Sequence, residues 1–207
     1  MRKLPNAGRK WIPTTEERIR AFRFGAAVTL ATLLLAAVLG APRGFAQATT
    51  PNEYQVKAAF LYNFGKFVEW PDTPPSIPFN VCVFGHDPFG HALDQAVAEK
   101  KIGDRPISLT RVGHVAALRE CQIVFVSSEE SSHVAEITGA VRGRSVLLVG
   151  ESEEFAGAGG TIQFFIQDNR VRFVINTDAA ERAGLKLSSK LLALASIVHD
   201  HPSAGKN

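Results

Sequence analysis

The sequence of 207 residues contains few of the residue types on which metal centres depend. It has two cysteines and six histidines. His86 and His91 are five residues apart, and His199 and His201 flank Asp200, so neither pair has a third ligand at the spacing of a zinc site. H-E-x-x-H and Cys/His clusters are missing. We therefore expect no metal and no cofactor, and solvated histidines are the simpler interpretation.

Motifs for nucleotide and nucleophilic chemistry are also lacking. Gly85 and Gly90 have the two-glycine spacing of a P-loop, but no Lys-Ser/Thr pair follows and Pro88 removes a backbone donor. G-x-G-x-x-G and G-x-S-x-G do not occur. Ser127 follows an apolar run, and its position before Glu129 is explained by capping of the next helix rather than by a nucleophilic role. The sequence therefore predicts a protein that is not an enzyme, with weak anion binding at a helix N-terminus left open.

The longest uncharged, mostly apolar run is shorter than a membrane-spanning helix. It covers Gly25–Leu39, whereas a span needs about 20 residues. A basic segment precedes it and Ala46-Gln47-Ala48 follows, which is the order of a cleaved secretory signal. We expect a signal peptide over residues 1–48, a domain over residues 49–200 and a polar tail over residues 201–207, in the periplasm. An uncleaved signal anchor is the alternative.

The basic charge of the chain belongs to its first segment. Residues 1–48 contain eight Lys+Arg and two Asp+Glu, which leaves 15 Lys+Arg and 18 Asp+Glu in the rest. The expected mature part therefore has a formal net charge of −3. A mildly acidic domain without a Lys/Arg stripe argues against nucleic-acid binding.

Both cysteines, Cys82 and Cys121, lie in the expected mature part. An even number in an exported chain indicates one disulfide, because the compartment is oxidising. Each cysteine lies in or just before a predicted strand, so neighbouring parallel strands would bring their Cα atoms within about 7 Å. Two free buried thiols are the alternative.

Strand and helix patterns alternate through the first two thirds of the mature part. This alternation predicts an α/β fold, a single three-layer domain with a mixed, mostly parallel sheet. Asp168-Asn169 separates two more strand patterns and adds a C-terminal antiparallel hairpin. The loop over residues 151–160 is expected to be flexible. Strands are predicted at 79–84, 105–112, 122–126, 145–149, 161–166 and 171–175, and helices at 54–68, 87–100 (Asp87 as N-cap, Pro88 first), 113–120, 127–141 and 187–198.

The first predicted helix has more apolar surface than one buried stripe requires. Phe60, Phe64, Phe67 and Trp70 are close in sequence, and aromatic residues are enriched at binding hot spots. We expect part of this surface, with Trp70, to contact a partner or a second copy in a homodimer. Core positions for all four are the alternative. The apolar positions at helical spacing are Val56, Ala59, Phe60, Asn63 and Phe67, widened by Leu61 and Phe64.

The second hairpin strand has an unusual polar face. In strand geometry Arg170 and Arg172 point to one side, while Phe173 and Ile175 point to the other. Two neighbouring arginines can hold a carboxylate, a phosphate or a partner's acidic patch. We therefore predict Arg170, Arg172 and the nearby Asn176 as contacts for a partner or ligand. A solvated outer face is the alternative.

Four segments together resemble the YfiR family of periplasmic repressor proteins. The similarity spans nearly all of residues 53–198, and its first and last segments are the most specific. They are residues 54–71 (YQVKAAFLYNFGKFVEWP), residues 85–90 with Leu93, residues 169–176 (NRVRFVIN) and residues 183–192 (AGLKLSSKLL).

The resemblance implies a regulatory role. Studied members bind the periplasmic sensor domain of an inner-membrane diguanylate cyclase and hold it inactive, until an outer-membrane lipoprotein or reducing stress releases it. This implies a repressor of cyclic-di-GMP signalling and biofilm formation, although members differ in partner. The pair Cys82 and Cys121 matches one family disulfide. A second pair, found around residues 156–163 in some members, is missing here, so redox control through that pair is not expected. A periplasmic sensor of small anions at the Arg170/Arg172 face is the competing hypothesis.

The signal pattern makes a direct prediction. The exported protein should begin at Thr49, because the A-x-A site ends at Ala48. Mass spectrometry of the periplasmic fraction measures this terminus. A stable periplasmic product that still contains residues 25–39 contradicts the prediction.

Overall fold

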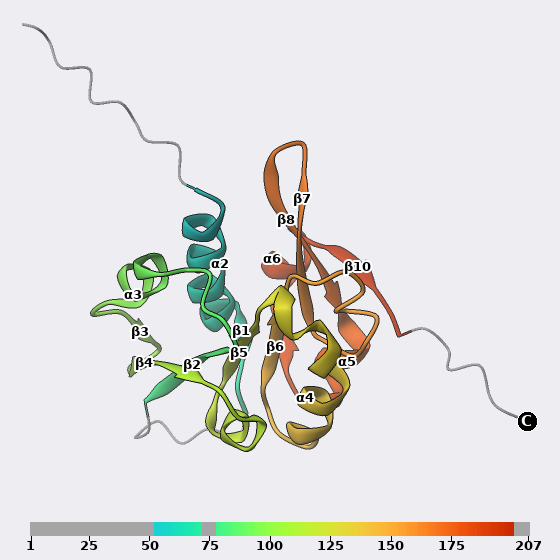
Figure 1. Cartoon of the computed structure of the whole chain (residues 1–207), viewed down its shortest axis with the longest axis horizontal. Coiled ribbons are helices and arrows are strands. Elements are labelled where there is room, and N and C mark those ends of the chain that lie inside the picture. The colour runs from blue at the N-terminus through green and yellow to red at the C-terminus, as the bar shows by residue number, and fades with distance from the viewer. Residues whose placement is uncertain (1–51, 72–77, 201–207) are drawn as a thin grey trace, which may run out of the picture. The chain divides into compact units, whose positions relative to one another are not determined.

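The computed structural model describes residues 52–71 and 78–200 (Figure 1). The expected signal segment 1–48 and tail 201–207 lie outside the described residues. The described part is built around an eight-stranded sheet with the order β10-β8-β7-β6-β5-β2-β4-β3. Its strands are β2 (Phe79–Phe84), β3 (Lys101–Ile102), β4 (Arg105–Val112), β5 (Ile123–Val126), β6 (Leu147–Gly150), β7 (Ile162–Gln167), β8 (Arg170–Asn176) and β10 (Ser196–Val198).

The sheet is mixed but largely parallel and curls as a half-barrel. Only β7–β8 and β3–β4 pair antiparallel within it. Helices cover both faces, which confirms the predicted three-layer α/β class with its antiparallel hairpin. One face carries α2 (Glu53–Phe67) and α3 (His91–Val97), and the other carries the 3-10 helices η1 (Val115–Glu120) and η2 (Ser128–His133) with α4 (Val134–Ala140). The remaining elements are α5 (Thr177–Arg182), α6 (Ser189–Leu192) and the two-stranded sheet of β1 (Val68–Glu69) and β9 (Lys186–Leu187).

Helix α2 begins with a capping box. Asn52 Oδ1 accepts a hydrogen bond from Gln55 N, and Gln55 Oε1 accepts one from Asn52 N. Both donors are among the first backbone N–H groups that a helix leaves unsatisfied. The box therefore explains why the helix starts at Glu53 rather than in the polar residues before it.

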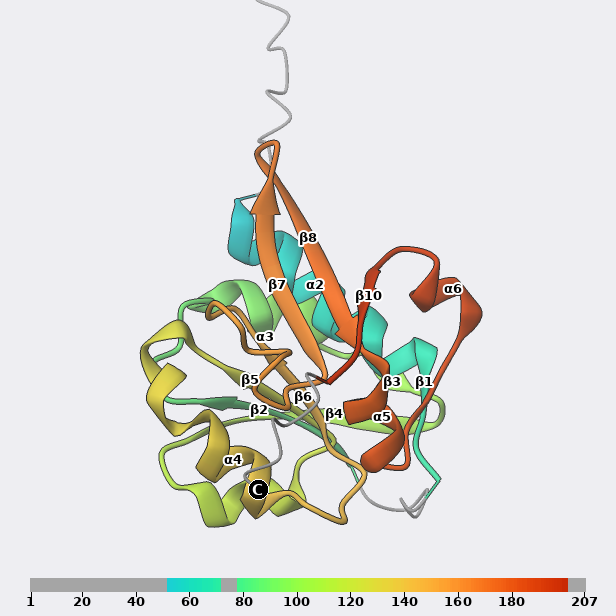
Figure 2. The ribbon, with the colours of Figure 1, turned by 90° about the vertical axis from the view of Figure 1, so that its right-hand side faces the viewer.

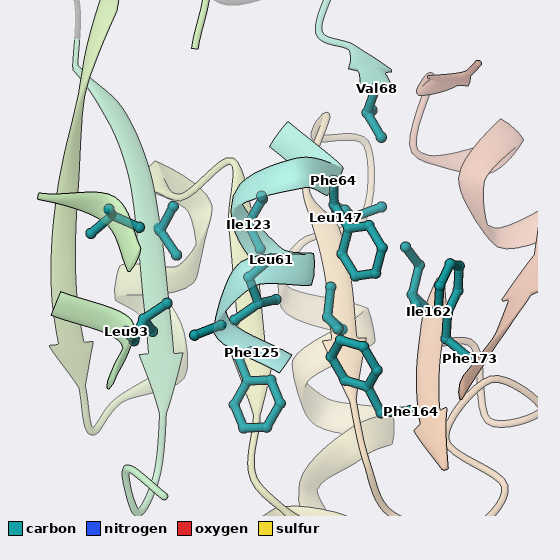
Figure 3. Packing of buried hydrophobic residues seen from close by; sticks show 14 of the residues in the cluster. Leu61, Phe64, Val68, Leu93, Ile123, Phe125, Leu147, Ile162, Phe164 and Phe173 are labelled. Atoms are coloured by element: carbon teal, nitrogen blue, oxygen red, sulfur yellow. The ribbon is translucent and has the colours of Figure 1, made fainter. Parts of the chain in front are cut away.

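The face that α2 buries differs from the predicted one. Leu61 and Phe64, which we placed at the margin, are fully buried, whereas Ala59 is exposed and Phe60 and Phe67 are half-buried. Figure 3 shows Leu61 and Phe64 packed towards the sheet. The sequence contains two overlapping apolar stripes, and only the shape of the sheet decides which of them is covered.

The close approach of α2 to the sheet depends on Gly65. A Cβ atom there would lie 2.9 Å from Ile102 Cδ1 and 3.5 Å from Phe79 Cε1. Both neighbours belong to the amino-terminal side of the sheet, at β2 and β3. The C-terminal end of α2 therefore lies at the amino end of β2, and α2 runs antiparallel to the parallel strands.

The helix predicted to start at Asp87-Pro88 starts later and is shorter. Asp87 Oδ1 accepts a hydrogen bond from Phe89 N at 2.8 Å, which forms a local turn instead of a helix cap. This turn places Phe89 in the core, where its ring meets that of Phe125 with centroids 4.6 Å apart. The helix then covers only His91–Val97, and Glu99 ends the segment with φ of 58°.

The closing helix predicted over residues 187–198 is wrong. The structure has only the short α6, with Ser188 as its N-cap, and then strand β10. Ile197 pairs with Ile175 of β8, so the apolar residues of this segment continue the sheet. Helix α5, which directly follows β8, was not predicted.

The loop over residues 151–160 is anchored rather than free. Phe155 is 1% exposed and packs between two glycines, because a Cβ atom at Gly150 or Gly160 would lie within 2.5 Å of its ring. The expectation of a flexible loop came from its glycines and acidic residues. Those glycines instead make room for the buried ring.

The disulfide between Cys82 and Cys121 is confirmed, with Cα atoms 6.0 Å apart. Cys82 lies in β2, and Cys121 directly follows η1 before β5. Strands β2 and β5 are parallel neighbours, with Val81 opposite Ile123. The bridge therefore joins the end of η1 to the interior strand β2, on the face opposite α2.

Removing this bridge should destabilise the fold. It spans 39 residues in sequence, and chain-entropy arithmetic gives about 4 kcal/mol for such a loop. We expect the Cys82→Ala/Cys121→Ala variant to unfold at a lower denaturant midpoint and with a larger m-value, because the unfolded chain without the bridge is less compact. A midpoint equal to that of the oxidised wild-type protein contradicts this account.

Candidate partner-binding surface

The outer part of the β7–β8 hairpin forms a projecting arm, residues 165–172, which we call the hairpin arm. Figure 2 shows it extending beyond the other strands. Phe164 and Phe173 at its root are buried, whereas no residue of the arm is buried. Asp168 and Asn169 at the turn have φ of 50° and 56°, as the favoured two-residue hairpin turn requires. The predicted hairpin is thus confirmed.

The two predicted arginines lie on the hairpin arm. Arg170 pairs with Gln167 and Arg172 with Phe165 across the hairpin, and both arginines are exposed. Neither makes an ion pair or a side-chain hydrogen bond within residues 52–71 and 78–200. Their guanidinium groups are therefore available to bind carboxylate or phosphate groups.

The opposite face of the hairpin is apolar and roots it in the core. Phe164 and Phe173 pack against Phe60 and Phe64 of α2, with ring centroids 5.2–6.0 Å apart. Towards the tip the same face carries Ile166, which is 49% exposed. The hairpin arm therefore presents arginines on one side and an exposed apolar residue on the other.

Two more large apolar side chains are exposed at the C-terminal part of the domain. Leu194, after α6, is 66% exposed and Ile197 of β10 is 43% exposed. Ile197 pairs with Ile175, so it points to the α2 side of the sheet, as Ile166 does. Contiguous apolar patches mark contact sites, whereas single exposed apolar residues are common on protein surfaces.

Trp70 lies far from the arginines along α2. Its ring packs edge-on against Phe79 at a centroid distance of 5.1 Å, and its Nε1 donates to the Gly65 carbonyl oxygen at 3.3 Å. These contacts place it at the amino end of β2, whereas the hairpin turn lies at the carboxyl edge. The half-buried ring also stabilises the core, so a partner contact at Trp70 and one at the hairpin arm would be separate.

Asn176 is fully buried. Its Oδ1 accepts a hydrogen bond from Ala179 N and caps α5, and its Nδ2 donates to the Ala156 carbonyl oxygen and to Asp200 Oδ1. These bonds connect β8 with the loop over residues 151–160 and with Asp200, shortly after the end of β10. Because its polar atoms are used in the fold, we leave Asn176 out of the proposed contact surface.

The sequence analysis missed a buried ion pair at the carboxyl edge of the sheet. Lys57 of α2 is 3% exposed, and its Nζ lies 2.5 Å from Glu151 Oε2 at the end of β6. It also pairs with Glu53, and it lies 4.7 Å from the centroid of the Tyr54 ring. The pair joins the first turns of α2 to the parallel strands and fixes the direction of the helix.

The ionisation of Lys57 excludes it as a nucleophile or base at neutral pH. Burial by itself would lower the pKa of Lys57, but the hydrogen bonds and charges of Glu151 and Glu53 raise it above its ordinary value. A catalytic lysine needs the opposite shift. Burial, together with the charge of Glu151, likewise raises the pKa of Tyr54. This cluster therefore stabilises the fold and is not arranged for catalysis.

Other polar groups found in the sequence lie apart from one another. Ser127 is buried directly after β5, and its hydroxyl has no hydrogen-bond partner within the described part of the chain. His199 contacts Asp178 at 2.9 Å and closes the end of β10 on α5. Among the described residues no three His, Cys, Asp or Glu side chains are arranged to bind a metal. The described helices are also too short or too polar to cross a membrane.

This geometry defines a class of protein: a three-layer α/β module with a projecting hairpin arm, whose two arginines make no ion pair with any other described residue. The chain matches the YfiR/HmsC-like family over residues 54–196. It therefore belongs to that family, as its motifs suggested.

The fold is also similar to that of a solved structure, a conserved domain protein from Vibrio cholerae O1 biovar El Tor. The two share 12% sequence identity with a TM-score of 0.52. The match covers 70% of this chain and 60% of the other protein. At this identity the likeness shows a shared fold alone.

The buried pair leads to a stability prediction. Lys57→Met should destabilise the protein by about 3–5 kcal/mol in chemical denaturation, because Glu151 is left buried without its partner. Lys57→Met/Glu151→Gln should recover much of this loss. Lys66→Met on the exposed side of α2 is the matched control and should change stability by about 0.5 kcal/mol or less. Equal effects at Lys57 and Lys66 would show that the pair is unimportant.

Proposed function

We propose that this protein is a non-enzymatic regulator of the periplasm that binds a membrane signalling protein, an inner-membrane diguanylate cyclase, and restrains it. The observation that carries this proposal is the family match over residues 54–196. Such a protein would lower cellular cyclic-di-GMP and biofilm formation. Release by an outer-membrane lipoprotein and action as a homodimer belong to the same proposal.

Two features support action outside the cytoplasm. The chain carries a signal-like segment before residue 49, and the Cys82–Cys121 bridge is of a kind that persists in oxidising compartments. The bridge is buried, since both cysteines are 2% exposed. A protein stabilised in this way suits the periplasm.

The hairpin arm is the surface that we assign to the partner. Its arginines suit acidic groups on a partner, and Ile166 offers an apolar contact on the opposite face of the hairpin. Its rigid root positions these side chains before binding, which lowers the entropy cost of association. An open strand face does not enclose a small molecule, and enclosure is what ligand sites usually provide. The arm therefore favours a protein partner over a small anion.

We expect Arg170→Ala/Arg172→Ala to weaken binding to the periplasmic domain of the cyclase by about tenfold or more. Titration of purified domains by calorimetry measures this change. In a strain that lacks the wild-type protein, the same variant should fail to restore low cyclic-di-GMP. Trp70→Ala tests separately whether the far end of α2 takes part.

Arg119→Ala on η1 is the matched control, because Arg119 is also exposed but lies outside the hairpin. It should bind and repress like the wild-type protein. Thermal unfolding should show that all variants fold. If folded Arg170→Ala/Arg172→Ala binds the cyclase as tightly as wild type, the arginines are not the contact.

A further inference from the structure

A second feature lies on the face of the sheet opposite α2. A cavity of about 450 Å³ opens between α4, α5 and the start of β6. This volume is within the range of pockets that hold small organic ligands. Val146 and Leu148 form an apolar floor, and both are 3% exposed. No residue of the hairpin arm lines it.

Small side chains keep this cavity open. Ala179 and Ala183 line it from α5, and Gly143 and Gly159 line it from two loops. Gly143 and Gly159 have φ of 71° and 101°, which residues with side chains rarely adopt. The backbone thus favours glycine at two positions of the wall, where a side chain would be strained.

Three arginines surround the cavity. Arg182 of α5 is already paired with Asp200, through its Nη1 and Nη2. Arg142 and Arg144, in the turn after α4, are exposed and make no ion pair within the described ranges 52–71 and 78–200. Two uncompensated positive charges therefore stand beside an apolar floor. Thr161, which also lines the cavity, adds a hydroxyl group.

We propose that this cavity binds an amphiphilic organic anion. The apolar body of the ligand lies on Val146, Leu148 and Ala179, and its carboxylate or phosphate group binds Arg142 and Arg144. Guanidinium groups bind such oxyanions through paired hydrogen bonds. The proposal is independent of the partner-binding role of the hairpin arm, because the two sites share no residue.

The test is calorimetric titration of the purified protein with decanoate, below its micelle concentration. Wild type should bind decanoate. Decan-1-ol, which lacks the charge, and inorganic phosphate, which lacks the apolar body, should each bind at least tenfold more weakly. Arg142→Ala/Arg144→Ala should weaken decanoate binding about tenfold, as expected for loss of charge-assisted hydrogen bonds.

Ala183→Trp is designed to fill the cavity and should abolish binding while leaving both arginines in place. Arg119→Ala and Arg172→Ala, outside the cavity, should bind decanoate like wild type. Circular dichroism and thermal unfolding check that each variant folds. The proposal is overturned if wild type does not bind decanoate, or if binding is unchanged in the arginine variant and in a folded cavity variant. Equal affinity for decanoate and decan-1-ol overturns the requirement for an anion.

Discussion

The packing of Leu61 and Phe64 onto the curled sheet is the interaction on which the rest of the domain depends. Both side chains are fully buried and lie against residues from β5, β6, β7 and β8, as Figure 3 shows. The parallel strands are apolar on both faces, so each face needs a cover. Burying two such side chains contributes about 3–6 kcal/mol. Helix α2 thus covers one side of the sheet together with α3.

The direction of α2 follows from its two ends. At the first turns Lys57 is tied to Glu151, and near the other end Gly65 allows contact with Phe79 and Ile102. Phe60 and Phe64 then meet the rings of the β7–β8 root. Because α2 packs against the root of the hairpin, the hairpin arm is held in a fixed position. The arm is exposed because none of its residues is buried. The same packing that stabilises the domain therefore holds the proposed contact surface in place.

The predictable parts of the fold are those determined by local sequence. Strand β4 was predicted with its observed bounds, and Asp168-Asn169 indicated the hairpin because both residues tolerate positive φ. Strand β10 was wrongly predicted as helix. Its extended conformation depends on pairing with β8, which lies about 20 residues earlier in the chain. Lys57 was overlooked for the same reason: its partner is 94 residues away.

In the candidate site, too, some features follow from local sequence and others depend on contacts between residues that are distant in sequence. The exposure of Arg170 and Arg172 follows from strand alternation and was predictable, as was the Cys82–Cys121 bridge from the cysteine count. The burial of Asn176 depends on contacts with Ala156 and Asp200, which no local pattern indicates. The arginine-lined cavity between α4 and α5 likewise exists only in the assembled fold.

The central claim is that the hairpin arm contacts a membrane signalling protein. The most direct measurement is photo-crosslinking in living cells, with a benzoylphenylalanine in place of Gln167 at the tip of the arm. A separate variant carries the same residue in place of Gln95, which is also exposed and lies on α3. The account predicts an ultraviolet-dependent adduct with a diguanylate cyclase from position 167 and none from position 95. No adduct from position 167, or the same adduct from both positions, contradicts it.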